Sequence, residues 1–377
     1  MTWTVALTDV AMAEEDLEAV ADTLRSGWLT MGPRTRDFEV AVQEWTTARH
    51  AVAVSSGTAA LHLACAALGL GPGDEVIVPA FTFLATAHAP RYVGATPVLA
   101  DVVAPARPNL DPADVERRIT PRTRAVIAVH MCGYAADMDT LNAICREHDL
   151  HLIEDAAQAI GARVDAAGAQ AGAAGTIGCL SFFSKKQLCV GEGGMVLTGD
   201  AALAERVRLL RSHAMTSGTW DRHRGHEDSY DVVDVGFNFR LDEPRAALGL
   251  ARLPRLADHI ERRRATVRAY RERLGGVDGI TLMWDEAAVA AGSHFAFPVL
   301  LPSGQARHRA AGAIAARGVQ TTHYPALHEL TEYAPYAAKG SVPQAEATAA
   351  RHLVLPLSAS MTPEQIDLVV DAVRAAL

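Results

Sequence analysis

The sequence is short of lysine. Of its 377 residues only Lys185, Lys186 and Lys339 are lysines, and arginine supplies nearly all of the remaining positive charge. An arginine guanidinium stays protonated at any workable pH and cannot act as an amine nucleophile. If the protein performs carbonyl–amine chemistry, these three lysines are therefore the only candidates. Lys339 lies in a loop of small residues, Gly and Pro, where we expect it to be solvated, which leaves the adjacent pair.

Long apolar runs, basic runs and paired cysteines are also missing. No stretch approaches membrane-spanning length, and the N-terminus lacks the charged-then-apolar order of a secretion signal, so we expect a cytoplasmic protein that does not bind a membrane. A net charge of −9 without a basic run argues against a nucleic-acid partner. The five cysteines have no metal-type spacing and the 15 histidines do not cluster, so we expect no metal site.

The order of the predicted elements indicates an α/β fold. Hydrophobic residues make up 49% of the chain and charged residues 21%, which allows a full core and two domains. Strands and helices alternate from about residue 50 to 199, a rhythm typical of a mostly parallel sheet with helices on both faces. A helical stretch at 242–274, broken or kinked at Pro254, then leads out of this region. We expect a large α/β domain at 13–254 and a smaller C-terminal α+β domain at 255–377, with residues 1–12 packing on the smaller one.

The lysine pair lies between two predicted strands. It is followed by a Gly-Glu-Gly-Gly turn at 191–194, after which another apolar strand begins. A lysine in such a setting usually has a chemical role. Taken alone, however, the pair is explained as well by a solvated hairpin or a phosphate clamp. Three other segments favour a chemical role for the pair.

The first segment, 54–83, contains a strand, a Ser-Ser-Gly-Thr turn at 55–58 and a helix. A turn of this kind presents backbone N–H groups and the positive end of a helix dipole, which together bind phosphate. The signal is weak alone, because capped helices follow strands in every α/β protein. A Gly-x-Gly-x-Gly run at 69–73 follows a helix and precedes a strand, which is the wrong order for the nucleotide site of a Rossmann dehydrogenase.

The second and third segments carry acidic and polar side chains at element ends. Glu154 and Asp155 end a predicted strand, where open α/β sheets bind ligands. An aspartate there can keep a pyridine nitrogen protonated and make the ring an electron sink, or it can cap the helix that follows. Asn238 and Arg240 lie in an aromatic loop before the long helix, where they could reach a phosphate or carboxylate, unless the loop only packs its aromatic rings.

Seven motifs in this order carry a resemblance to a known family. They are GWLTMGP (27–33), SSGTAALH (55–62), VPAFTFLATA (78–87), IEDAAQAIGA (153–162), SFFSKKQL-x-x-GEGG (181–194), GFNFRLDEPRAALGLARL (236–253) and HYPALH (323–328). This arrangement resembles the sugar aminotransferases of the DegT/DnrJ/EryC1/StrS family, pyridoxal phosphate (PLP) enzymes of fold type I with an aspartate aminotransferase-like fold. The resemblance runs from about residue 26 to about residue 362, and no motif is out of order.

The resemblance implies a role for each matching residue. The Schiff-base lysine of the family lies five residues before the first glycine of the GEGG turn, which selects Lys186 over Lys185. Asp155 matches the carboxylate that pairs with the pyridine nitrogen, and Gln158 the side chain beside the ring hydroxyl. Phe83 matches the aromatic residue that stacks on the ring. The remaining matches are Gly57, Thr58, Ala59 and Ser181 for the cofactor phosphate, Asn238 for the same phosphate from a neighbouring subunit, and Trp28, Thr30, Arg240, His323 and Tyr324 for the substrate.

The resemblance also implies a reaction and its partners. The expected enzyme is a homodimer that uses PLP and its pyridoxamine form to move an amino group from L-glutamate to a nucleotide-linked keto-sugar, in amino-sugar biosynthesis. A dTDP-4-keto-6-deoxyhexose is the substrate favoured by analogy. A cyclitol ketone of the inosose type and a 3-keto sugar remain alternatives. Lys186 disfavours a dehydratase that works without a Schiff-base lysine, and the lack of an extra domain disfavours a non-catalytic PLP-binding protein.

Three positions depart from common family patterns. Gln187 follows the lysine where many members have Asn, Phe183 replaces a frequent Tyr or His, and Ser-Ala-Ser at 358–360 replaces a His/Tyr-Pro-Gly turn. The first two line the expected route to the substrate. The ring carbon and the nucleotide therefore stay open.

Overall fold

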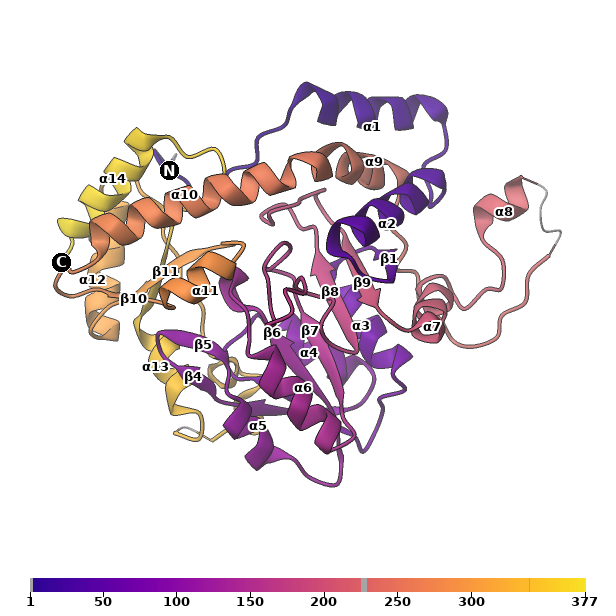
Figure 1. The fold of residues 1–377 in the computed structure, drawn as a ribbon, viewed down its shortest axis with the longest axis horizontal. Helices are drawn as coiled ribbons and strands as arrows, with labels where there is room; N and C mark the ends of the chain where they lie inside the picture. The colour runs from indigo at the N-terminus through magenta and orange to yellow at the C-terminus, as the bar shows by residue number, and fades with distance from the viewer. Residues whose placement is uncertain (1–2, 225–228, 339) are drawn as a thin grey trace.

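A seven-stranded sheet forms the centre of the computed structural model, which describes residues 3–224, 229–338 and 340–377 (Figure 1). Five neighbouring strands run parallel, and β9 is antiparallel to both of its neighbours, β8 and β1. The predicted mostly parallel sheet is therefore confirmed. In spatial order the strands are β1 (His50–Val54), β9 (Gly194–Thr198), β8 (Ile177–Ser181), β7 (His151–Asp155), β6 (Thr123–Val129), β2 (Glu75–Pro79) and β3 (Thr96–Ala100).

Both faces of the sheet are covered, which explains the continuous apolar character of its strands. On β6 the neighbouring residues Val126 and Ile127 are fully buried yet belong to two different core clusters, because successive side chains of a strand point to opposite faces. The covering helices are α2 (Pro33–Thr46), α5 (Pro112–Arg118), α6 (Met138–Glu147) and α9 (Glu243–Arg252) on one face, and α3 (Gly57–Ala67), α4 (Ala85–Tyr92) and α7 (Ala201–Arg211) on the other.

The long helical stretch is broken where the sequence predicts it. Helix α9 ends at Arg252, a 3₁₀ turn spans Leu253–Arg255, and α10 continues as Leu256–Leu274. Proline lacks the N–H that the helix interior requires, so the regular hydrogen-bond ladder stops at Pro254. Figure 1 shows α10 running from the sheet region toward the C-terminal elements.

The C-terminal region has its own small antiparallel sheet. It consists of β10 (Thr281–Leu282), β11 (Phe297–Leu300) and β12 (His352–Leu355), with α11 (Glu286–Ala291), α12 (Gly304–Ala315), α13 (Pro343–Arg351) and α14 (Pro363–Arg374) around it. The N-terminal segment joins this region, because Val5 forms a parallel bridge with Val319 and the Leu7 N–H donates to Gln320 Oε1 at 2.9 Å. The boundary between 254 and 255 stays a prediction.

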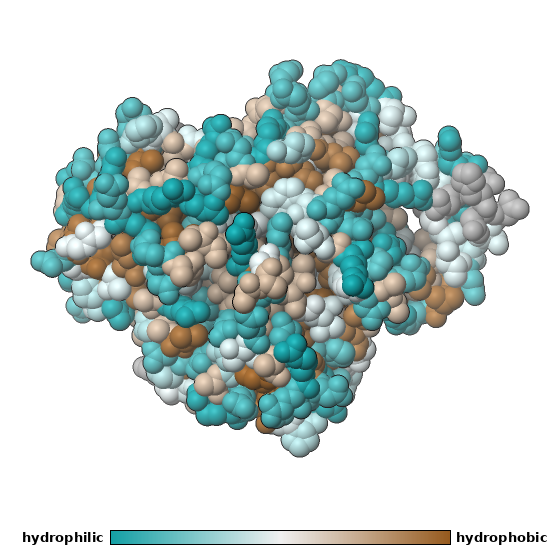
Figure 2. Space-filling view, in the orientation of Figure 1, coloured by the Kyte–Doolittle hydropathy of each residue, from teal (hydrophilic) through white to brown (hydrophobic). Residues whose placement is uncertain are grey.

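The remaining elements are the helices α1 (Glu14–Ser26) and α8 (Thr219–His223), the hairpin β4 (Val102–Ala104) and β5 (Arg107–Leu110), and the 3₁₀ turns η1 (Met131–Gly133), η3 (Leu327–Glu329) and η4 (Ala334–Tyr336). Figure 2 shows apolar residues on one face of the molecule as scattered patches between hydrophilic ones.

Several predicted absences can be compared with the described part of the chain. All five cysteines are buried and unpaired. The described residues contain no group of His, Cys, Asp and Glu that could hold a metal ion. Within the same residues, no helix combines the length and the apolar character needed to cross a membrane. Lys339 and residues 225–228 lie outside the described residues.

Candidate active site

A cavity of about 410 Å³ lies at the carboxyl ends of β7 and β8 and reaches the C-terminal region. Ligands of open α/β sheets bind at this edge, because loops and helix N-termini converge there. The cavity brings together residues from segments far apart in the sequence. The predicted site residues that line it are Gly57, Thr58, Phe83, Asp155, Gln158, Ser181, Lys186 and Tyr324.

Both lysines of the pair line this cavity, but only Lys185 is exposed to solvent. Lys186 Nζ lies 4.4 Å from the centre of the Phe295 ring. Burial disfavours the charged form and lowers the pKa of Lys186 to about 8, although the Asp155 carboxylate acts in the opposite direction. A substantial fraction of the amine is therefore neutral at mildly alkaline pH, as a nucleophile toward a carbonyl requires.

Asp155 is the last residue of β7, and its carboxylate is held at both oxygens. Oδ2 accepts a hydrogen bond from Thr86 Oγ1 at 2.7 Å, and Oδ1 accepts one from the Ala157 N–H at 3.2 Å. Thr86 is completely buried and is hydrogen-bonded in turn to Thr82 at 2.9 Å. The aspartate thus stabilises the turn after the strand and also lines the cavity. Residues 156–176, all of them described, form no helix, so the capping interpretation is wrong, and the pairing with a pyridine nitrogen stays a prediction.

Glu154, the neighbouring carboxylate, is committed to the fold. It is fully buried and accepts hydrogen bonds from His130 Nε2 at 2.9 Å and from the backbone of a turn, through the N–H groups of Gly172, Ala174 and Gly175. The cavity is lined by Asp155 and not by Glu154. Of the two adjacent acids, only Asp155 is available to a ligand.

The turn before α3 approaches the end of β8 very closely. A Cβ atom on Gly57 would lie 2.8 Å from Ser181 Cβ, so only glycine fits at this position. Ser56 caps the helix, and its side chain accepts the Ala59 N–H at 3.0 Å. The Ala59 N–H is therefore already used, and Ala59 does not line the cavity, which leaves Gly57, Thr58 and Ser181 as the residues that could hold a phosphate.

Gln158 and Gln187 form a polar wall behind the cavity. Gln158 Oε1 accepts the Cys132 N–H at 2.8 Å, and its carbonyl oxygen accepts Gln187 Nε2 at 2.8 Å. Gln187 Nε2 also reaches Ser293 Oγ at 3.0 Å. Gln187, which replaces the Asn of many family members, is buried. Its side chain therefore supports the wall and does not point into solvent.

Two aromatic side chains line the cavity. The Phe83 side chain lines the cavity and is 59% exposed, as suits a surface on which a planar ring can stack. Tyr324 also lines the cavity, and its ring stacks on His352 with the centroids 5.8 Å apart. Burial raises the pKa of Tyr324 well above its usual range, so its hydroxyl stays protonated.

Five other predicted residues do not line this cavity in the single chain. Asn238 is exposed, and its backbone pairs with Ser212, whose hydroxyl accepts Arg240 at 3.2 Å. Trp28 lines a different cavity and packs against Trp220 with ring centroids 4.7 Å apart. Thr30 and His323 also lie away from it. All five lie in segments between the named helices and strands.

The structure adds residues that the sequence prediction missed. Thr82 and Thr86 orient Asp155, Phe295 faces the lysine amine, and Glu192 of the GEGG turn lines the cavity. Both threonines lie inside the motif at 78–87, so the polar positions of this motif could have pointed to them. Nothing in the sequence pointed to Phe295, because it lies outside every motif.

The residues present fit a phosphorylated pyridine aldehyde. One cavity combines a partly neutral amine, a buried carboxylate at strand end, an exposed aromatic face and a glycine turn beside a serine. An amine, an acid that protonates a ring nitrogen and a phosphate cradle are what amino-group transfer on such a cofactor needs. Together with the mixed sheet, this site defines an aminotransferase.

The chain belongs to the DegT/DnrJ/EryC1/StrS aminotransferase family, whose model matches residues 10–374. A dTDP-3-amino-3,4,6-trideoxy-alpha-D-glucose transaminase from Streptomyces venezuelae is 39% identical over 379 residues, covering 98% of this chain and 95% of that protein. A UDP-N-acetyl-3-dehydro-alpha-D-glucosamine 3-aminotransferase from Acidithiobacillus ferrooxidans is 39% identical over 368 residues, covering 97% of this chain and 95% of that protein.

A solved structure agrees with the fold. The crystal structure of DesV from S. venezuelae in complex with a ketimine intermediate matches with a TM-score of 0.89 and 38% identity, covering 100% of this chain and 98% of that one. The family and the aminotransferase fold expected from the sequence are confirmed.

Proposed function

We propose that this chain is a PLP-dependent aminotransferase that moves an amino group from L-glutamate to a nucleotide-linked keto-sugar. The observation that carries the proposal is that Lys186 and Asp155 line one cavity together with the Gly57 turn. Membership of the aminotransferase family supports the reaction class. The names of the two relatives support a sugar bound to a nucleotide as the acceptor.

Each residue of the chain has a separate task in this reaction. Bound in the cavity, PLP would supply an exchangeable aldehyde and a ring that accepts electrons. The Asp155 carboxylate holds the proton on the pyridine nitrogen, and Lys186 Nζ takes and returns the proton at the α-carbon of the donor. Gly57, Thr58 and Ser181 bind the phosphate, and Phe83 covers one face of the ring.

The ring carbon that receives the amino group is the finer part of the proposal. The names of both relatives refer to an amino or keto group at carbon 3 of the sugar. This favours a 3-keto sugar over the dTDP-4-keto-6-deoxyhexose suggested by analogy, which is kept as the second candidate. A cyclitol ketone is the third compound to compare.

A homodimer completes the proposal. Asn238 is exposed and does not line the cavity of its own chain, so a phosphate contact from this residue requires a second copy. The preceding segment exposes Tyr230, Val232, Val233 and Val235, the last of these at 84%. Apolar side chains gathered on one segment mark an interaction surface, and a second copy of the chain would cover them.

Two variants test the assignment of the lysine. The Lys186→Ala protein should lose covalent attachment of the cofactor and turnover, because Lys186 is the amine whose pKa is lowered by burial, whereas Lys185, which also lines the cavity, is exposed. The Lys185→Ala protein should keep both. Borohydride reduction followed by peptide mass spectrometry measures the attachment, and equal loss in the two variants would refute the assignment.

A substrate panel tests the acceptor. The pyridoxamine form of the enzyme is titrated with a dTDP-linked 3-keto sugar, a dTDP-4-keto-6-deoxyhexose and an inosose, and the return of the PLP spectrum is followed. We expect the dTDP-linked 3-keto sugar to react faster than the dTDP-4-keto-6-deoxyhexose, and the inosose to fail. Reaction with the inosose alone would overturn the proposed substrate class.

A further inference from the structure

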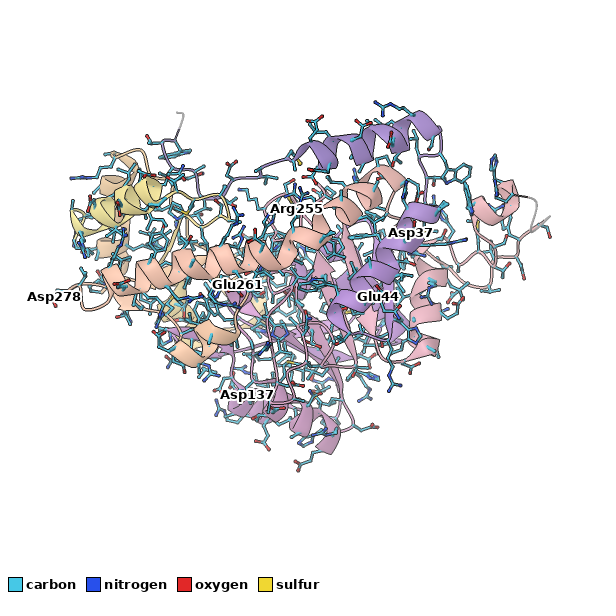
Figure 3. All side chains as sticks on the ribbon, turned by 45° about the horizontal axis from the view of Figure 1, so that its top comes forward. Asp37, Glu44, Asp137, Arg255, Glu261 and Asp278 are labelled. Atoms are coloured by element: carbon cyan, nitrogen blue, oxygen red, sulfur yellow. The ribbon has the colours of Figure 1, made fainter. Side chains whose placement is uncertain are left out.

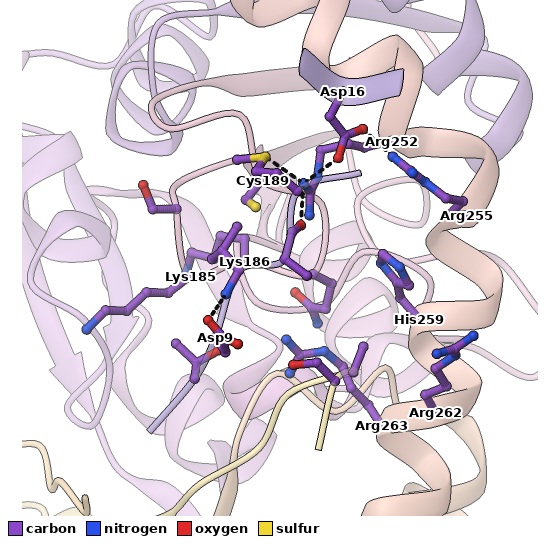
Figure 4. Close-up of a pocket in the computed structure, with 18 of the residues that line it drawn as sticks. Asp9, Asp16, Lys185, Lys186, Cys189, Arg252, Arg255, His259, Arg262 and Arg263 are labelled. Carbon is purple, nitrogen blue, oxygen red and sulfur yellow. Dashed lines mark hydrogen bonds and ion pairs between the residues drawn. The ribbon is translucent and has the colours of Figure 1, made fainter. Parts of the chain in front are cut away.

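A second cavity of about 200 Å³ adjoins the first (Figure 4). It lies between the N-terminal segment at 8–13, the loop at 184–189 and the helices α9 and α10. Thr8, Lys185 and Lys186 line both cavities, so the second one shares a wall with the reactive amine. We call it the arginine pocket. Its basic lining residues are Lys185, Lys186, Arg252, Arg255, His259, Arg262 and Arg263, and its acidic ones are Asp9 and Asp16.

Positive charge exceeds negative charge in the arginine pocket. Asp16 is shared by two guanidinium groups, since it pairs with Arg252 at 3.0 Å and also with Arg255. Outside the lining, Arg255 also lies 3.6 Å from Glu15, and Arg262 pairs with Asp258 at 2.8 Å. Arg255 is the last residue of the 3₁₀ turn before α10. Figure 3 shows it near α1, the helix that carries Asp16. Arg263 has no carboxylate partner among the described residues, and its Nη1 donates only to backbone oxygens of residues 294, 295 and 357. At least one buried cation therefore lacks a counter-charge.

Donors of these arginines also lack acceptors. The Nε atoms of Arg252, Arg255 and Arg263 are buried without a hydrogen-bond partner. Arg252 is 6% exposed and Arg263 is 4% exposed. Burial lowers the pKa of Arg263 to about 10, as expected for a cation removed from water without a partner anion. Buried donors and surplus positive charge are both stabilised by an oxyanion.

The size and position of the pocket restrict the oxyanion. A cavity of about 200 Å³ is too small for a nucleotide-linked sugar, whereas a single carboxylate with its short chain fits. The α-carbon of an amino donor must lie at Lys186 Nζ, and its α-carboxylate is one bond away from that carbon. Only a second carboxylate, several bonds further on, would reach the adjoining pocket.

We propose that the arginine pocket binds the side-chain carboxylate of a dicarboxylic amino donor and so selects the donor. The proposal rests on the proposed transaminase function. Arg255 and Arg263 are the residues that hold the carboxylate, and the neighbouring Lys186 receives the amino end of the same molecule. A monocarboxylic donor such as alanine would leave the pocket without its anion.

The test uses the holoenzyme and compares two donors. In single-turnover experiments with L-glutamate, the variants Arg255→Gln and Arg263→Gln should lower kcat/KM about tenfold or more, the size expected for a lost charge-assisted hydrogen bond. With L-alanine the same variants should change kcat/KM by less than about twofold, because alanine does not reach the pocket. The matched control is Arg268→Gln, an exposed arginine on the same helix outside the pocket, which should change neither value.

A non-reacting probe gives an independent readout. Glutarate has two carboxylates but no amino group, and its binding to the holoenzyme is measured by titration calorimetry, with inorganic phosphate as a second probe. Both pocket variants should weaken glutarate binding about tenfold or more. Phosphate that binds while glutarate does not would overturn the proposal in favour of a phosphate site.

Three further outcomes would overturn it. Equal losses with both donors would mean that the arginines only support the fold. A loss confined to the keto-sugar half-reaction would assign the pocket to the acceptor, and unchanged kinetics would leave the arginines without a role in donor selection.

Arg263 donates to three backbone oxygens, so if its variant does not fold, Arg255→Gln carries the test alone. If no keto-sugar is aminated, the proposed function fails, while glutarate binding still decides the pocket.

Discussion

The Lys186 amine differs from the other cations of the chain in its surroundings. It faces the Phe295 ring at 4.4 Å, and burial lowers its pKa to about 8. The Asp155 carboxylate opposes this shift but is not strong enough to reverse it. A buried amine beside an aromatic ring is therefore prepared to react before any cofactor arrives.

The reactivity of Lys186 should follow its lowered pKa. In the apoprotein, labelling by trinitrobenzenesulfonate should reach half its maximal rate near pH 8, because the protonated amine below this pH is unreactive and the neutral amine above it reacts. Peptide mass spectrometry separates Lys186 from the exposed Lys185, which serves as the internal reference. A half-maximal rate at the ordinary lysine value of 10.5 would contradict the role of burial.

Thr86 is a positioning residue for Asp155. In Thr86→Val the hydroxyl that donates to Asp155 Oδ2 is removed while the side-chain volume is kept. We expect kcat to fall about tenfold, because one hydrogen bond to a charged group contributes about 1.5 kcal/mol. The KM for the acceptor should be unchanged, since Thr86 does not line the cavity.

Two further variants control for the fold. Thr86→Ser keeps the hydroxyl and should restore most of kcat. Thr82→Val removes the second link of the chain, the hydrogen bond between the threonines, at a residue that also lines the cavity, and should have a smaller effect. If Thr86→Val and Thr86→Ser lose activity equally, the hydrogen bond to Asp155 is not responsible.

Between elements, Glu243 ties α9 to the start of α2. Its Oε1 accepts the N–H groups of Gly32 at 2.8 Å and Thr35 at 2.9 Å, and its Oε2 accepts the Arg34 N–H at 2.9 Å. The first N–H groups of a helix have no partner within the helix. Here another helix supplies the carboxylate, and that carboxylate is buried.

Loss of this carboxylate should destabilise the protein. We expect Glu243→Ala to lower the free energy of unfolding by roughly 3 kcal/mol, because several buried N–H groups lose their acceptor together. Urea denaturation followed by circular dichroism measures this free energy. Glu44→Ala, on the exposed side of α2, is the control and should stay within about 0.5 kcal/mol. Equal effects would show that Glu243 acts only as a surface charge.

At the scale of the whole molecule, the segment before Asn238 is not explained by one chain. Figure 1 shows α8 projecting beyond the sheet and its covering helices. Between α8 and α9 the chain exposes Val232, Val233 and Val235 to solvent. Folding of a single copy leaves these side chains in water, which is unfavourable unless a partner covers them.

Mixed dimers test whether Asn238 acts across subunits. Co-expression of Lys186→Ala and Asn238→Ala chains should restore about a quarter of wild-type activity, because half of randomly formed dimers are mixed and each has one intact site. Activity is measured against each variant alone. If both residues act within one chain, the mixture contains no intact site and activity stays at the level of the variants.

Much of the fold was predictable from local patterns. The strands at 96–100 and 151–155, and the break at Pro254, follow from apolar runs and from the missing proline N–H. Strand β12 and helix α13 were not predicted, because their short segments have no strong periodicity and are held by neighbours distant in sequence. Helix α2 begins at Pro33, since proline is favoured in the first turn.

The sequence by itself determined the class of the protein, the lysine pair and the order of the motifs, because each motif is a few adjacent residues at a strand end or turn. Only the tertiary structure decided between Glu154 and Asp155, showed that Ser56 already holds the Ala59 N–H, and brought Thr86 to the carboxylate. The physical reason is that hydrogen bonding and burial depend on distances in space. Residues 69 positions apart along the chain, such as Thr86 and Asp155, meet only when the sheet has formed.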